Sequence, residues 1–142
     1  MIIQTLSNLV GHKVEDLSVI IQGFTGSPRS GSMTGALIAT NSVYSISQGR
    51  VIDVRKDENG LYCITVQYAP DKWFRYCLIE STTFNSGMPV YTGNKLGQAH
   101  KGQIRFEYAT LEESLYPIRL HDRVFYKHDP TNVLLARSYE DL

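Results

Sequence analysis

The sequence has no long apolar run and no excess of charge of either sign. No stretch approaches the roughly 18 consecutive apolar residues of a membrane span, and the first residues lack the basic start and apolar core of an export signal. Lys and Arg number 14, as do Asp and Glu, so no surface for capturing nucleic acid or an anionic membrane is predicted. We therefore expect a protein folded in a cytoplasm that binds neither nucleic acid nor membrane.

Cysteine is scarce too. Cys63 and Cys77 are the only two cysteines. They lie on segments that are expected to form neighbouring strands, and two cysteines do not make a disulfide framework. Because an export signal is lacking, we expect two reduced, partly buried thiols. No motif supplies the base that a thiol nucleophile needs.

Between residues 36 and 108 the chain has strand character throughout. Apolar and polar residues alternate, and turn signals recur about every eight to twelve residues, as in compact β domains. The expected strands include 18–24, 36–39, 43–46, 50–55, 61–68, 73–80 and 103–108. No βαβ unit is present, which excludes a dinucleotide-binding fold. The pattern predicts an all-β fold, a compact antiparallel and barrel-like sheet with short helical or extended arms at both ends.

Residues 86–108 are expected to form tight turns on short strands. Gly87, Gly93 and Gly97 are expected to supply positive φ angles or close backbone approach. In the last strand, alternation separates two faces. One face carries Gln103, Arg105 and Glu107, and the other carries Ile104, Phe106 and Tyr108.

The two ends differ from the middle, so we predict three parts: an N-terminal arm and loop (1–32), a β domain (33–109) and a C-terminal appendage (110–142). Residues 1–17 are expected to form a short helix or an irregular arm, and 25–35 a linker rich in Gly and Ser. In the appendage we expect a helical turn at 110–115 and a short helix with Asp129 as N-cap and Pro130 at its first position.

Histidines and aromatics suggest no further site. His12, His100, His121 and His128 form no constellation that suits a metal or a nucleophile with its base. Most aromatic residues alternate along strands, as core residues do. Trp73, Tyr91 and Tyr139 are the ones that we consider for an exposed protein interface.

Taken together, residues 33–108 resemble the lysostaphin-like, LytM-type zinc endopeptidase domain, which cuts peptide cross-links in bacterial cell walls. The resemblance rests on the glycine spacing of residues 87–97 and on five segments that follow one another in the family's order. These segments are 33–40, 49–52, 62–64, 75–78 and 103–107, the last in place of the family's His-Leu-His-Phe-Glu.

The resemblance also implies a zinc site, and this sequence departs from it. The three zinc-ligand positions hold Met33, Leu37 and Arg105, and two further histidine positions hold Cys77 and Gln103. Zinc needs about three ligands of His, Asp, Glu or Cys type, and a permanently charged arginine repels the ion. We therefore predict no catalytic, metal or cofactor residues and a protein that is not an enzyme, and leave open whether these five positions form a residual binding surface.

The resulting hypothesis is a non-catalytic structural or assembly protein of a bacteriophage virion, in the tail or baseplate, assembled in the host cytoplasm. Its terminal arms would dock other virion proteins, and a homo-oligomer is left open. Two alternatives remain: a peptidoglycan endopeptidase with substituted metal ligands, and an adaptor that holds peptidoglycan without cutting it.

Overall fold

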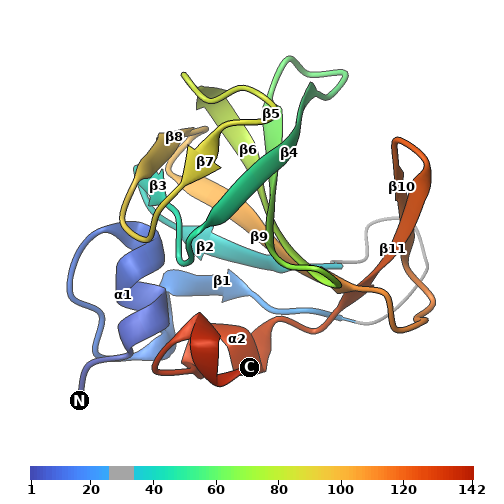
Figure 1. Cartoon of the computed structure of the whole chain (residues 1–142). Coiled ribbons are helices and arrows are strands. Elements are labelled where there is room, and N and C mark those ends of the chain that lie inside the picture. Colours follow the sequence, from blue (N-terminus) through green and yellow to red (C-terminus); the bar gives the residue numbers. More distant parts are fainter. Residues whose placement is uncertain (26–33) are drawn as a thin grey trace.

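The computed structural model describes residues 1–25 and 34–142, which form an antiparallel sheet with short helices at one side (Figure 1). The α-helices are α1 (Gln4–Val10) and α2 (Thr131–Leu135), and the 3₁₀ turns are η1 (Leu17–Val19) and η2 (Tyr139–Asp141). The strands are β1 (Ile20–Gln22), β2 (Ala36–Ala39), β3 (Ser42–Tyr44), β4 (Gly49–Lys56), β5 (Tyr62–Ala69), β6 (Lys72–Ser81), β7 (Pro89–Val90), β8 (Lys95–Ala99), β9 (Gln103–Thr110), β10 (Pro117–Leu120) and β11 (Arg123–His128). The predicted all-β antiparallel fold is confirmed.

Strand β9 lies inside the sheet, between β2 and β6. The main strand order is β1-β2-β9-β6-β5-β4-β7, with the β10–β11 hairpin joined to β9, and β8 joined to both β6 and β3. Both chain ends thus contribute strands, because β1 pairs with β2 and β11 pairs with β9. The division into three parts stays a prediction.

The main core covers one face of this sheet. Ile104 and Phe106 of β9 are fully buried in it, as the alternation predicts. Helix α1 adds Leu6 and Leu9 to this core, and α2 adds Val133 and Leu134, so both helices lie on this face. Among the described residues, no helix is long and apolar enough to cross a bilayer.

A second, smaller core lies on the other face of the sheet. Trp73 is fully buried there, and its ring stacks on Phe125 of β11 with centroids 3.7 Å apart. Ala109 and Leu120 complete the cluster. The expectation that Trp73 lies at an exposed interface is therefore wrong, because the β10–β11 hairpin folds over it, whereas Tyr91 is 59% exposed.

The predicted glycine turns are confirmed. Gly87 and Gly93 have φ angles of 96° and 90°, which side chains rarely tolerate. Gly97 is needed for another reason, because a Cβ atom there would collide with the backbone oxygen of Ser81. The close approach lets β8 lie against β6.

The terminal segments differ from expectation in detail. Gly11 ends helix α1 with φ at 80°, so it acts as the C-cap of this helix. Residues 111–115 contain no helix, because β9 continues to Thr110 and bends follow. Helix α2 begins at Thr131, and Pro130 is its N-cap. The Asp129 carboxylate still accepts a hydrogen bond from the Thr131 amide at 2.9 Å.

Candidate functional site

Three of the five positions named by the resemblance lie side by side on the face that carries the smaller core. Leu37 on β2 is the cross-strand partner of Arg105 on β9, and Arg105 is also the partner of Cys77 on β6. Gln103 lies two residues from Arg105, opposite Ala39. Directly opposed residues point to the same side of a sheet, so these side chains share one surface. Met33 lies outside the described residues.

Next to Arg105 the two cysteines form a disulfide. Cys63 on β5 and Cys77 on β6 have Cα atoms 4.0 Å apart and are linked, so the prediction of two reduced thiols is wrong. An irregular register between Tyr62 and Ile64, with Leu78 at a φ of 67°, brings the two side chains together. Sequence spacing could not reveal that register.

Replacing both Cys63 and Cys77 by alanine is expected to lower the free energy of unfolding by about 3 kcal/mol, because the disulfide closes a loop of about 15 residues in the unfolded chain. Urea denaturation measures the effect. A reductant should lower the stability of the wild type to that of the double variant and leave the variant unchanged. Two titratable thiols in the unreduced, denatured wild type would contradict the pairing.

A buried carboxylate that pairs with three cations lies near the disulfide. It belongs to Glu107, two residues along β9 from Arg105. Glu107 is fully buried, and its Oε2 accepts hydrogen bonds from Arg105 Nε and Lys127 Nζ, each at 3.0 Å. Its Oε1 accepts from Arg75 Nη1. Arg75 Nε also donates to Thr65 Oγ1 at 3.1 Å. Strands β6, β9 and β11 thus meet at this carboxylate, and β5 is linked to it through Thr65 and Arg75.

The cations dominate the electrostatics of this cluster. Burial alone would raise the pKa of Glu107, but Arg75, Lys127 and Arg105 together outweigh it and hold that pKa below the ordinary 4.5. Burial lowers the pKa of Arg75 and of Lys127, and Glu107 opposes the shift only in part. One carboxylate is shared among three cations, so Glu107 stays ionised while each cation is incompletely neutralised.

Zinc does not fit the positions that the resemblance names. Leu37 has no donor atom, the Cys77 sulfur is in a disulfide, and the Arg105 guanidinium lies against Glu107. A guanidinium repels a cation, and a disulfide sulfur is no thiolate ligand. Within residues 1–25 and 34–142, no group of three or more His, Cys, Asp and Glu residues could hold a metal ion.

A second ion pair lies across the disulfide, on β4. Arg55 Nε and Nη2 lie 2.7 and 3.3 Å from the two carboxylate oxygens of Asp53. His121 Nε2 lies 3.5 Å from the same carboxylate. Asp53 is the partner of Thr65, and Arg55 is the partner of Cys63, so this pair points to the same face as Arg105.

Sequence reasoning named Arg105 but missed the other basic members of this surface. Arg75 could have been found, because it alternates with Cys77 along one strand. Lys127 carries no local signal, since only the pairing of β11 with β9 brings it to Glu107. Two of the histidines have partners elsewhere: His100 pairs with Glu80 at 2.8 Å, and His128 lies 2.9 Å from Thr110 Oγ1.

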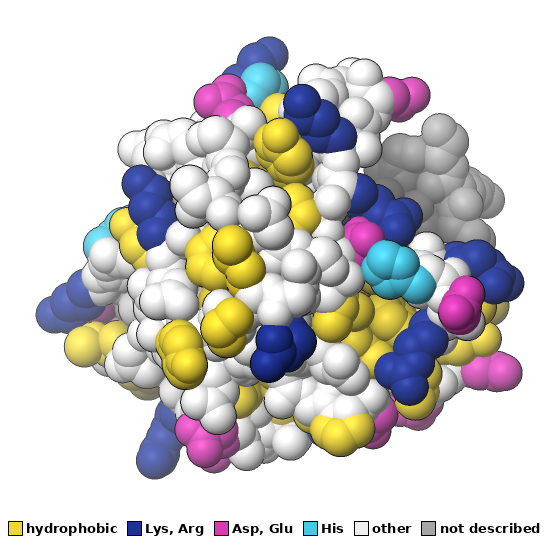
Figure 2. Space-filling view, turned by 45° about the horizontal axis from the view of Figure 1, so that its top comes forward, with side chains coloured by type: hydrophobic (Ala, Val, Ile, Leu, Met, Phe, Trp, Pro, Cys, Tyr) yellow, Lys and Arg dark blue, Asp and Glu magenta, His cyan; other side chains and the backbone are white. Residues whose placement is uncertain are grey.

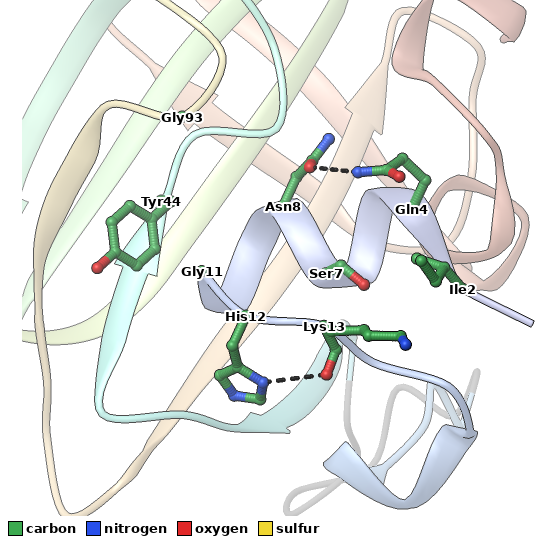
Figure 3. A pocket seen from close by; sticks show the side chains of 9 residues that line it. All are labelled: Ile2, Gln4, Ser7, Asn8, Gly11, His12, Lys13, Tyr44 and Gly93. Carbon is green, nitrogen blue, oxygen red and sulfur yellow. Dashed lines mark hydrogen bonds between the residues drawn. The ribbon is translucent and has the colours of Figure 1, made fainter.

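A hollow of about 500 Å³ lies elsewhere, between α1 and β3 (Figure 3). Gln4 and Asn8 are hydrogen-bonded at its rim, and the His12 ring lies 3.3 Å from the Lys13 carbonyl oxygen. The lining includes neither Leu37, Cys77 nor Arg105. These side chains do not converge on a common point in Figure 3, so we do not assign chemistry to this hollow.

Comparison with known proteins gives structural matches alone. No protein-family profile and no curated protein sequence matches the chain. A zinc-containing peptidase from Vibrio cholerae is 26% identical over 63% of this chain and 32% of its own, with a TM-score of 0.54. The catalytic domain of EnpA, a prophage-encoded protein from Enterococcus faecalis, is 17% identical over 65% of this chain and 80% of its own, with a TM-score of 0.56.

The antimicrobial peptidase lysostaphin from Staphylococcus simulans matches over 92% of this chain and 51% of its own, with 17% identity and a TM-score of 0.65. This chain thus spans about half the length of lysostaphin and about a third of the Vibrio cholerae peptidase. The expected lysostaphin-type fold is confirmed.

These matches correct the prediction that the chain is not an enzyme. The solved structures that share its fold include several peptidases, one of them described as containing zinc. The prediction relied on five side chains. They determine whether one metal site can form, but they do not determine the class of proteins that share this fold. Nothing in these matches supports a bacteriophage tail. This chain has the fold of lysostaphin-type peptidase domains.

Proposed function

We propose that this chain recognises peptide of the bacterial cell wall, with the sheet face around Arg105 as its contact surface. One observation carries the proposal: the fold is that of lysostaphin-type peptidase domains, and Leu37, Cys77 and Arg105, which the sequence resemblance assigns to the site, lie together on one face. The Arg105 side chain is 31% exposed there, so a ligand can reach it.

The proposal predicts that the chain sediments with purified peptidoglycan. Leu37→Glu, a half-buried position beside Arg105, should weaken the binding, because a carboxylate there would compete for the arginine. Ile2→Glu is the matched control, since Ile2 is 50% exposed at the start of the chain. Binding that is equal in all three proteins, or absent in the wild type, would contradict the proposal.

Cleavage of wall peptide is a second candidate, favoured by the peptidase fold of the structural neighbours. Release of soluble peptide from peptidoglycan, together with the zinc content of the purified protein, tests it. Because the five named positions do not suit zinc, a full equivalent of zinc would have to be held by other residues. No released peptide would argue against cleavage.

The setting that we propose is a bacteriophage tail or baseplate. One neighbour is encoded by a prophage, which fits a bacteriophage origin and says nothing of a tail or of the role. The terminal segments offer a docking surface, where Met1, Ile2, Leu17 and Leu135 line a groove of about 480 Å³. Mass spectrometry of purified tails tests the setting, and tails that lack this chain would contradict it.

A further inference from the structure

The face around Arg105 carries more positive than negative charge. Its ion pairs join four cations, Arg55, Arg75, Arg105 and Lys127, to only two carboxylates, Asp53 and Glu107. Residues 26–33, outside the described part, contain no Asp or Glu. Two positive charges are therefore uncompensated in this group, although the whole chain is neutral and the charges on the side drawn in Figure 2 are mixed in sign.

The exposed members of this group flank the disulfide. Arg55 is the cross-strand partner of Cys63, and Arg105 is the partner of Cys77. Since neighbouring strands lie about 4.8 Å apart, the two arginines rise from positions three strand spacings apart. Arg105 extends across the disulfide toward Arg55, because its Nη2 lies 4.0 Å from Cys63 Sγ. Their side chains are 48% and 31% exposed.

Both guanidinium groups keep hydrogen-bond donors for a ligand. Arg105 Nε donates a hydrogen bond to Glu107, and Arg105 Nη2 contacts only the Cys63 sulfur, at 4.0 Å. Arg55 gives Nε and Nη2 to Asp53. Within the described residues, the other Nη hydrogens of Arg55 and Arg105 have no hydrogen-bond acceptor. Free donors on two arginines above an apolar disulfide match a planar carboxylate, which arginine binds in bidentate fashion.

We infer that Arg105 and Arg55, which flank the buried Cys63–Cys77 disulfide, form a binding site for the free carboxylate of a peptide. This inference deepens the proposed recognition of wall peptide and rests on it. The buried Glu107 holds Arg105 in place and leaves its outer nitrogens free. Lys127 and Arg75 add positive potential beneath the ligand.

Two probes test the site: N-acetyl-tetraalanine with a free C-terminal carboxylate, and the same peptide as an amide. In a titration followed by NMR, the carboxylate form is expected to bind at least tenfold more tightly, because only it offers a charged acceptor. Arg105→Gln should weaken binding of the carboxylate form about tenfold or more and leave the amide unchanged. The matched control is Arg119→Gln, since Arg119 is exposed on the outer side of the β10–β11 hairpin.

Equal binding of the two peptides would overturn the site, and so would equal weakening by Arg119→Gln or preference for inorganic phosphate over the peptide. Sedimentation with peptidoglycan separates this inference from the proposed function. If wild type and Arg105→Gln sediment alike, wall recognition stands and the carboxylate site fails. If the free-carboxylate peptide binds, Arg105→Gln weakens that binding, and the wild type does not sediment with peptidoglycan, the site stands and wall recognition fails. If the wild type binds neither the free-carboxylate peptide nor peptidoglycan, both fail.

Discussion

Replacing Glu107 by glutamine is expected to lower the free energy of unfolding by about 3–5 kcal/mol, the usual cost of removing one partner from a buried ion pair. Glu107 is fully buried and is the shared partner of Arg75, Arg105 and Lys127. Glutamine keeps the shape and one acceptor oxygen, so the loss reports the charge. Arg75, with a side chain only 6% exposed, would be left buried without a counterion. Urea denaturation measures the change.

The control is Glu80→Gln. The Glu80 side chain is 49% exposed and pairs with His100, and such exposed pairs contribute about 0–1 kcal/mol to stability. If Glu107→Gln does not fold, a triple variant with Arg75→Met and Lys127→Met should recover stability, because apolar replacement of all buried partners is often neutral. Equal stability of Glu107→Gln and Glu80→Gln would contradict the role of the cluster.

The same variant makes a pH test. Because the pKa of Glu107 lies below 4.5 in the folded chain, its contribution to stability is present above that value and is lost as the pH falls through the folded pKa. Wild-type stability should therefore decline below about pH 4.5, and Glu107→Gln should decline less. Parallel declines in the two proteins would show that other carboxylates dominate the acid response.

Replacing Phe125 by alanine is expected to cost about 3–5 kcal/mol, as for other large buried aromatics. Phe125 is 1% exposed and stacks on Trp73. Trp73 is the only tryptophan, so its fluorescence should shift to longer wavelength as water reaches the ring. The shift reports the hairpin directly, independently of global stability.

Tyr91→Ala is the matched control, because Tyr91 is 59% exposed, and surface substitutions usually change stability by at most about 0.5 kcal/mol. If Phe125→Ala left both the unfolding curve and the fluorescence unchanged, the β10–β11 hairpin would not be part of the cooperative fold. The prediction thus tests whether residues 117–128 stabilise the face that holds Glu107.

Strand pattern and turns followed from local chemistry. Alternation in residues 103–108 separated Ile104 and Phe106 from Arg105 and Glu107 correctly, because strand side chains alternate wherever the strand lies. Gly87 and Gly93 marked positive φ angles, which few other residues adopt. The resemblance also named Leu37, Cys77 and Arg105, which the fold then placed side by side.

Other features depended on pairing between distant segments. The disulfide needed the irregular register of β5 against β6, and the burial of Trp73 needed the hairpin of residues 117–128 to fold back onto β6 and β9. In both cases the local pattern was compatible with another outcome, a free thiol or an exposed ring.

The sequence by itself determined the all-β class, the turns, the apolar face of β9 and the absence of zinc-type side chains at Leu37 and Arg105. Only the tertiary structure decided that Glu107 is buried beneath three cations, that the cysteines are joined, and that Arg55 and Arg105 flank them. The physical reason is that alternation and turn preference act between neighbours in the chain, whereas charge pairing and burial depend on strand register. Register is set by the whole sheet.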